Sequence, residues 1–310
     1  MTSIQSRLFY WLLRFSKSRS PLADRNTTLA QQRAMMDEMS KRYEKYFPAD
    51  VKRQSVRVEE RNAEWLKPQN AIENRVLLYL HGGAFTMGSL SEGRNLAALL
   101  ALACRATTLS LDYRLAPEHP FPAALEDGVA AYRWLLAQGF CAKQVALVGE
   151  SAGGNLALVT VIALRDAGDP LPAAVVALSP ITDLTLNGET ITSRRKQDPM
   201  LTREWVHSHI IRYTNGRDPS LPLISPLYAD LHGLSPMLIQ AGENEILFSD
   251  SVSLAEKARR TGVDVTLEIE KGMWHVWHKF AMLPESKGAI ERIGKFVCMK
   301  FDHAGGHFSV

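Results

Sequence analysis

The sequence Gly-Glu-Ser-Ala-Gly at residues 149–153 lies between two segments of different periodicity. Before it, residues 144–148 (QVALV) form a short apolar run that predicts a buried strand. After it, residues 155–166 carry apolar side chains at helical spacing. Glycines on both sides of Ser151 suit a tight turn at which strand and helix come close together. The pattern predicts a nucleophile elbow, which holds Ser151 out of the fold at the positive end of the following helix.

Strands and helices alternate along most of the remaining chain, which predicts right-handed crossovers and a mostly parallel sheet with helices on both faces. A short alternating strand is expected at 55–59, followed by a turn region that contains Pro68 and Asn70. The expected buried strands are 76–80, 106–111, 144–148, 173–179, 237–241 and 263–268, and the expected helices are 91–103, 122–137, 155–166, 249–261 and 285–301.

Two regions depart from this alternation, and we interpret them as a helical cap. Residues 1–48 read as helical, with a second helix at about 28–46. Residues 182–228 are polar and contain several prolines, with only short helical runs such as 203–213. An insertion after a sheet strand lies above the strand ends, where ligands bind. We therefore expect N-terminal cap helices within residues 1–50 and a catalytic domain at 51–310, whose insertion at about 182–228 completes the cap.

The N-terminal helix is expected to be amphipathic. Its apolar run is too short for a secretory leader and is followed by basic residues without a small-residue cleavage site. The apolar face either covers an apolar cleft or touches a membrane surface, and covering is the role that we expect. No segment is long enough to span a bilayer, so we expect no stable membrane insertion. The residues at one-face spacing are Ile4, Leu8, Trp11, Leu12 and Phe15.

The composition argues against several other classes of protein. The 310 residues are 46% hydrophobic and 22% charged, which is ordinary for a globular protein with a large core. The net charge of +3 is too small to indicate nucleic-acid binding. Cys104, Cys141 and Cys298 are odd in number and lack metal-binding spacing. We expect three free thiols in a reducing, cytoplasmic compartment, and no metal.

A serine hydroxyl is a weak nucleophile until a base takes its proton, so a histidine should lie beside Ser151. His275, in Gly-Met-Trp-His at 272–275, lies in a turn after the last expected strand. That is the place of the base when the chain order is serine, acid, histidine. His278 is the rival three residues later, but it lacks the preceding glycine turn. We therefore expect His275 to be the base.

The acid that orients this histidine should follow the expected strand at 237–241. Glu243, Glu245 and Asp250 are the candidates, and no aspartate occupies the loop before Asp250. Glutamate is a permitted acid in a serine–histidine–acid triad. The residues themselves leave the choice among the three open.

Backbone N–H groups must stabilise the oxyanion that forms when the serine attacks a carbonyl. One of them should belong to Ala152, directly after the serine. The others should come from His-Gly-Gly-Ala-Phe at 81–85, which directly follows the expected strand at 76–80. Gly83 and Ala84 are the expected donors in this loop, and Gly82 is expected to shape it.

These motifs together resemble a known family. HGGAF at 81–85, DYRLAPEHPFPAA at 112–124, GESAGG at 149–154 and GMWH at 272–275 are similar to the hormone-sensitive-lipase-like (bacterial family IV) carboxylesterases. The resemblance extends over about residues 75–300 and implies the α/β-hydrolase fold. The run at 112–124 is highly specific to the family, where it mainly shapes the loop beside the oxyanion strand.

The resemblance also bears on single residues. The family carries its acid in an Asp-x-Leu motif, and Glu245 takes that place when Leu247 is aligned, which leaves Glu243 second and Asp250 third. The family's oxyanion loop usually reads His-Gly-Gly-Gly, and Ala84 keeps the donor of the third glycine if its φ is not positive. Where the family elbow usually has Asp or Thr, Glu150 either accepts a supporting hydrogen bond or faces solvent.

The implied function is a serine carboxylesterase that hydrolyses short- to medium-chain acyl esters through Ser151, His275 and Glu245, without a cofactor. Opening of a lactone by the same triad is an alternative. A non-catalytic ligand receptor is another, although such receptors lose the histidine that this chain retains. The expected partner is a small-molecule ester, and a homodimer is left open.

Overall fold

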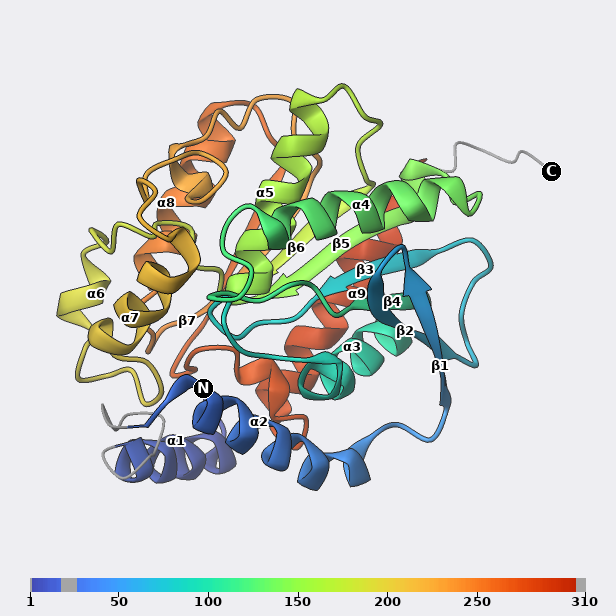
Figure 1. The fold of residues 1–310 in the computed structure, drawn as a ribbon. Coiled ribbons are helices and arrows are strands. Elements are labelled where there is room, and N and C mark those ends of the chain that lie inside the picture. Colours follow the sequence, from blue (N-terminus) through green and yellow to red (C-terminus); the bar gives the residue numbers. More distant parts are fainter. Residues whose placement is uncertain (1, 18–26, 305–310) are drawn as a thin grey trace.

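The computed structural model describes residues 2–17 and 27–304. Their centre is an eight-stranded sheet with the order β1-β2-β4-β3-β5-β6-β7-β8 (Figure 1). Strands β3 to β8 are parallel to one another, and β1 and β2 add an antiparallel edge beside β4. The expected α/β-hydrolase fold is confirmed. The strands are β1 (Val51–Val58), β2 (Arg61–Pro68), β3 (Val76–Leu80), β4 (Thr107–Leu111), β5 (Val145–Glu150), β6 (Ala174–Leu178), β7 (Met237–Gly242) and β8 (Val265–Glu270).

Helices cover both faces of the sheet, so the central strands are buried on both sides and read as continuous apolar runs. One core cluster packs α4, α5 and α8 against the sheet, and a second packs α3 and α9 against its other face (Figure 1). The helices are α1 (Ile4–Lys17), α2 (Leu29–Tyr43), α3 (Leu90–Cys104), α4 (Ala123–Ala137), α5 (Ala152–Asp166), α6 (Thr190–Ser193), α7 (Arg203–Thr214), α8 (Phe248–Arg260) and α9 (Pro284–Ala304).

The antiparallel edge differs from the expectation. β1 begins at Val51 rather than at residue 55, and most of the region expected as a turn forms β2. Glu64 lies buried in the middle of β2, where its carboxylate pairs with Arg94 of α3 at 2.8 Å. A carboxylate at a buried position interrupts the apolar alternation that identifies a strand, which is why β2 was missed.

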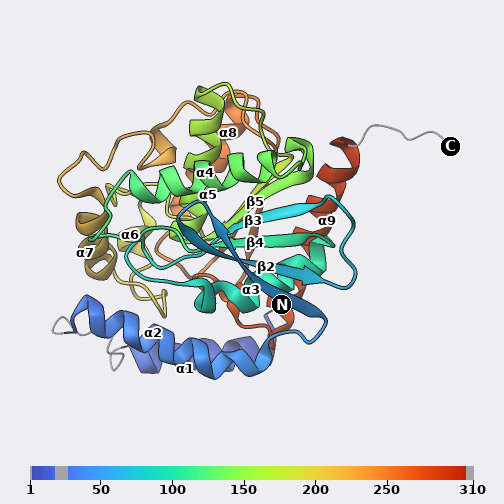
Figure 2. The same ribbon diagram turned by 45° about the vertical axis from the view of Figure 1, so that its right-hand side comes forward.

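The two regions expected to form the cap occupy different places. Helices α6 and α7, from the insertion at 182–228, lie beyond the carboxyl ends of the parallel strands (Figure 1). Helices α1 and α2 run together along one side of the molecule, outside α3 (Figure 2). The division into cap and catalytic domain stays a prediction. Among the described helices, none combines the length and apolarity that a bilayer crossing requires.

The N-terminal helix is present as α1, but it packs through the face opposite to the one expected. Ser6 is fully buried, and Phe9, Tyr10 and Leu13 pack against the cluster around Trp274. The expectation that the apolar stripe covers a cleft is therefore wrong. Both sides of α1 carry apolar side chains, so periodicity alone does not say which side turns inward. The outward residues Ile4, Leu8, Trp11, Leu12 and Phe15 are between 56% and 82% exposed.

Candidate active site

Ser151 lies at the sharp turn between β5 and α5, with φ 57° and ψ −118°. A positive φ is strained for a residue other than glycine and persists only where the surroundings hold it. The Ser151 N–H donates to the Leu178 carbonyl at 2.8 Å. A Cβ on Gly149 would lie 2.1 Å from the Gly153 oxygen, and one on Gly153 would lie 2.0 Å from the Leu80 oxygen. The approach of strand and helix therefore requires both glycines of the motif.

Ser151, His275 and Glu245 lie within hydrogen-bond distance of one another. His275 Nε2 is 2.9 Å from Ser151 Oγ, and His275 Nδ1 is 2.9 Å from Glu245 Oε2. Glu245 is fully buried and His275 is 5% exposed, whereas Ser151 is half-buried at the surface of the site. In this arrangement the imidazole can take the serine proton while the carboxylate holds the opposite ring nitrogen.

Ser179, directly after β6, is a site residue that the sequence did not indicate. Its Oγ donates to Glu245 Oε1 at 3.0 Å and accepts the Val276 N–H at 3.1 Å. The Gly242 N–H also donates to Glu245 Oε1. Ser179 thus ties the acid to the chain beside the histidine. The signal for it is the order β5-β6-β7, because a side chain after β6 lies between the serine and the acid.

The two rival acids have structural partners instead. Glu243 is exposed, and its Oε2 accepts the Gly272 N–H at 2.9 Å. Asp250 is buried, and its Oδ2 accepts the N–H groups of Thr182 and Asp183 at 2.8 Å and 2.9 Å. Burial raises the pKa of Asp250 to about 7. Within the described chain, neither carboxylate is hydrogen-bonded to His275.

His278, the alternative to His275, also has a structural partner. His278 is fully buried, and its Nε2 lies 2.8 Å from Gln240 Oε1. Burial lowers the pKa of His278 to about 3, so the ring is neutral at ordinary pH. Its position fits a structural role inside the fold.

The loop at 82–84 lies beside the serine turn. One of its N–H groups is hydrogen-bonded within the described chain, and two are not. The Gly82 N–H donates to Glu150 Oε1 at 2.9 Å, so Gly82 shapes the loop. The N–H groups of Gly83, Ala84 and Ala152 donate to no other group among the described residues. The condition attached to Ala84 is not met, because its φ is 52°, in the region that favours glycine. Ala84 therefore adopts a strained conformation while its N–H stays free.

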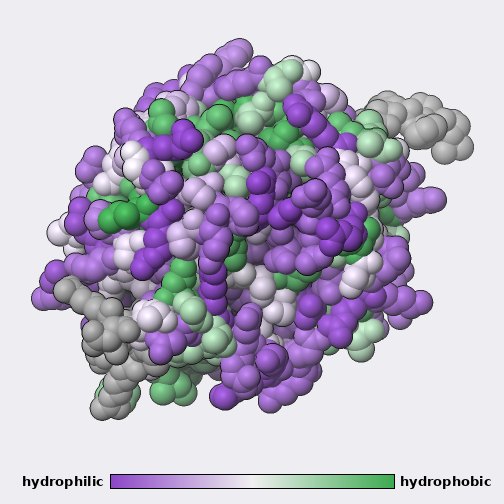
Figure 3. Space-filling model, in the orientation of Figure 1, coloured by the Kyte–Doolittle hydropathy of each residue, from purple (hydrophilic) through white to green (hydrophobic). Residues whose placement is uncertain are grey.

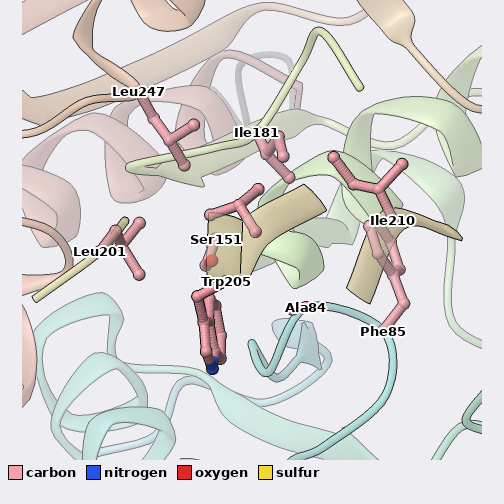
Figure 4. Close-up of a pocket in the computed structure, with 9 residues that line it drawn as sticks. Ala84, Phe85, Ser151, Ile181, Leu201, Trp205, Ile210 and Leu247 are labelled. Carbon is pink, nitrogen blue, oxygen red and sulfur yellow. The ribbon is translucent and has the colours of Figure 1, made fainter. Parts of the chain in front are cut away.

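An apolar pocket opens at Ser151 (Figure 4). It encloses about 310 Å³ of space between atoms, its open mouth included. The insertion supplies one wall, and the loops after β3, β6 and β7 supply the rest. The lining residues are Ala84, Phe85, Ser151, Ile181, Leu201, Trp205, Val206, Ile210 and Leu247. In the described part of the chain, no group of His, Cys, Asp or Glu side chains could hold a metal ion.

Known proteins resemble this chain over most of its length. A family model described as the alpha/beta hydrolase fold matches residues 77–279. An acetyl-hydrolase of Streptomyces hygroscopicus is 45% identical over 251 residues, which cover 81% of this chain and 82% of that protein. The crystal structure of an esterase from the bacterial hormone-sensitive lipase family is 41% identical, covers 97% of this chain and 99% of its own, and has a TM-score of 0.91. The chain belongs to the hormone-sensitive-lipase-like (family IV) carboxylesterases.

A further similar structure is EstE5, from a crystal soaked with p-nitrophenyl butyrate. It is 39% identical, covers 97% of the esterase and 99% of its own chain, and has a TM-score of 0.90. The similarity to these relatives shows that the protein is a carboxylic ester hydrolase.

In the esterase, Glu150 of the elbow is fully buried and accepts supporting hydrogen bonds. Tyr79 donates to its Oε2, and Lys279 Nζ lies 3.0 Å from its Oε1. Lys279 also bonds Glu92 at 2.9 Å. Burial opposes the charge of Lys279, but the two carboxylates outweigh it and raise the pKa of Lys279. No pattern in the sequence marked Tyr79 or Lys279, because their contacts join distant parts of the chain.

The family-specific run at 112–124 supports the loop at 81–85 of the esterase. Tyr113 Oη donates to the His81 carbonyl at 2.7 Å, and the two rings stack with centroids 4.2 Å apart. The Ala116 N–H donates to the Phe85 carbonyl at 2.9 Å. Arg33 of α2 donates to the Ala116 carbonyl at 2.9 Å, so an N-terminal helix also holds this region.

Proposed function

We propose that the esterase hydrolyses short- to medium-chain acyl esters through a triad of Ser151, His275 and Glu245. The observation that carries the proposal is the continuous path of contacts from Ser151 Oγ through His275 to the buried Glu245, at the mouth of an apolar pocket. The chemistry of the path is that of an activated serine nucleophile.

In the proposed reaction, His275 Nε2 takes the proton of Ser151 as Oγ attacks the ester carbonyl carbon. The carbonyl oxygen becomes an oxyanion, which the free N–H groups of the oxyanion loop and of Ala152 stabilise. The bond to the alcohol oxygen then breaks as His275 donates its proton to that oxygen, which leaves an acyl-enzyme. Water attacks the acyl carbon with His275 as base, and the carboxylic acid and free Ser151 are released. Glu245 keeps the ring oriented throughout.

The size and lining of the pocket support a preference for short and medium acyl chains. The space beside Ser151 is small and apolar, and Trp205 and Leu201 of the insertion close one side. The relatives agree in kind, since one is named an acetyl-hydrolase and another was soaked with a butyrate ester. The three cysteines are free, which supports a cytoplasmic, reducing site of action.

The test is hydrolysis of p-nitrophenyl esters from acetate to palmitate by wild type, Ser151→Ala and the control Ser55→Ala, which alters an exposed serine on β1. We expect kcat/KM to be highest for short or medium chains. Ser151→Ala should lower it by at least about 10³-fold, and Ser55→Ala should leave it unchanged. Activity of Ser151→Ala close to that of wild type would refute the triad. A maximum at palmitate would refute the chain-length assignment.

A further inference from the structure

The outer face of α1 carries a stripe of large apolar side chains that point away from the molecule. Ile4, Leu8, Trp11 and Leu12 are 82%, 63%, 61% and 56% exposed. At the helical spacing of about 100° per residue, all four fall within about 100° of one another. Figure 3 shows apolar residues at the lower edge of the molecule, where Figure 1 places α1. A contiguous exposed stripe of this kind marks an interaction surface, unlike apolar residues scattered singly.

The direction of this stripe is fixed, because α1 is attached to the fold at both ends. Near its start, Ser6 Oγ donates to Glu285 at 2.6 Å. At its end, Lys17 Nζ donates to the carbonyl oxygens of Asp198 and Leu201 at 2.7 Å and 2.6 Å. The buried side of the helix therefore stays against the body, and the apolar stripe stays outward.

The charges of α1 indicate which kind of surface this face would bind. The helix contains Arg7, Arg14 and Lys17 and no acidic residue. Arg7 and Arg14 are exposed and lie two turns apart along one flank of the stripe. The Arg14 guanidinium is 5.2 Å from the centroid of the Trp11 ring, so positive charge lies directly beside the apolar side chains.

We propose that this face of α1 binds the surface of a membrane that contains anionic phospholipids. A helix with an apolar stripe, flanking arginines and no carboxylate is suited to lie in the interface of such a bilayer. The stripe enters the boundary of the acyl chains, and Arg7 and Arg14 bind phosphate groups at its edge. This is attachment to a surface and requires no membrane-spanning segment.

A second copy of the chain fits this face less well. A two-fold contact through α1 would place the same surface on both sides of the interface. Arg7 and Arg14 of one copy would then lie close to the same residues of the other, with no acidic residue on α1 to compensate. Charge complementarity thus favours an anionic bilayer over self-association.

Attachment through α1 would bring the pocket at Ser151 close to the bilayer. Leu201, whose carbonyl Lys17 binds, lines the pocket at Ser151. An esterase held on a bilayer through α1 therefore has one wall of its pocket close to the lipid surface, where apolar esters concentrate. The binding itself does not depend on the proposed triad, so the two proposals can fail separately.

The test is flotation of the full chain with vesicles of phosphatidylcholine alone and of phosphatidylcholine mixed with phosphatidylglycerol. Wild type should float with the anionic vesicles, less at high salt, and not with the neutral ones. Arg7→Gln combined with Arg14→Gln should weaken binding by about 30-fold. Trp11→Glu should abolish it, whereas Met299→Glu, at a 43% exposed apolar residue of α9, should not.

Each variant is checked for unchanged hydrolysis of a water-soluble p-nitrophenyl ester, which shows that it is folded. Absence of flotation of wild type with either kind of vesicle would overturn the proposal. Flotation of Trp11→Glu at the level of wild type would do the same. A wild-type dimer in solution that Trp11→Glu converts to monomer would show that a second copy occupies the face instead.

Discussion

Glu245→Gln changes a single atom of the site, yet its surroundings make the change severe. Both carboxylate oxygens of Glu245 face hydrogen-bond donors. Gly242 and Ser179 donate to Oε1, and His275 Nδ1 lies 2.9 Å from Oε2. A glutamine has one oxygen and one NH₂ group, so its NH₂ must face a donor in either orientation.

The two orientations have different consequences. With the NH₂ group toward His275, the ring must present Nδ1 as an acceptor, which places its proton on Nε2 and leaves no base for Ser151. With the NH₂ group turned away, it faces the fixed N–H of Gly242 in a fully buried space. The loss of the correct tautomer costs about 10⁴ in kcat in serine–histidine–aspartate triads, which corresponds to about 5.5 kcal/mol. We expect a loss of the same order for Glu245→Gln.

The assay is kcat/KM for p-nitrophenyl butyrate, together with thermal unfolding to confirm that the variant is folded. Glu243→Gln is the matched control, because it is two residues away, is exposed, and keeps an oxygen for the Gly272 N–H. It should retain activity within a few-fold of wild type. A Glu245→Gln enzyme that keeps a tenth or more of wild-type kcat would refute the assignment of the acid, and a crippled Glu243→Gln enzyme would transfer that role to Glu243.

Three further results are expected. Trp205→Ala removes a wall of the pocket and leaves more room for the acyl chain. The kcat/KM for the p-nitrophenyl decanoate ester, divided by that for the butyrate ester, should therefore rise about tenfold. An unchanged ratio would contradict the role of this wall. Asp250→Asn keeps an oxygen for the Thr182 and Asp183 N–H groups but removes the raised carboxyl pKa. Folded Asp250 holds its proton up to about pH 7, whereas the unfolded chain releases it near pH 4. As the pH rises from about 4 to about 7, the free energy of unfolding of wild type should therefore fall relative to that of the variant, by on the order of 4 kcal/mol. Urea unfolding at a series of pH values measures this difference. Ala84→Gly relieves a positive φ that costs an L-residue about 1–2 kcal/mol, so Tm should stay the same or rise with activity retained. Ala84→Val keeps this strain and adds a β-branched side chain, which is disfavoured at a positive φ, so Tm should fall.

The parallel strands β3 to β8 could be predicted from the sequence to within two residues at every strand end, because strands buried on both faces leave uninterrupted apolar runs. The antiparallel edge could not be predicted, because Glu64 is buried through a partner on another element. Periodicity found the stripe of α1 but not its direction, since Phe9 and Leu13 on the other side are also apolar. The direction follows from Ser6 and Glu285, which are 279 residues apart.

The candidate site could likewise be predicted only in part from the sequence. Chain order and local motifs singled out Ser151 and His275, and the structure places them 2.9 Å apart. The choice of Glu245 as the proposed acid needed the family motif, because three carboxylates follow β7 and only tertiary contacts distinguish them. Ser179 had no local signal, since its function depends on the neighbouring strands.

The ion pair between Glu150 and Lys279 joins the residue before Ser151 to the residue four positions after His275, and the Lys279 side chain is 28% exposed. Removing one member of this pair takes away part of the charge compensation of the other, which is unfavourable where the remaining group is shielded from water. Substitution of Glu150 alone, even by the Thr common in the family, therefore leaves the Lys279 ammonium facing Glu92 only. Over evolutionary time, positions 150 and 279 of this lineage should change together, so orthologues that lack the Glu at position 150 should also lack the Lys at position 279 more often than those that keep it.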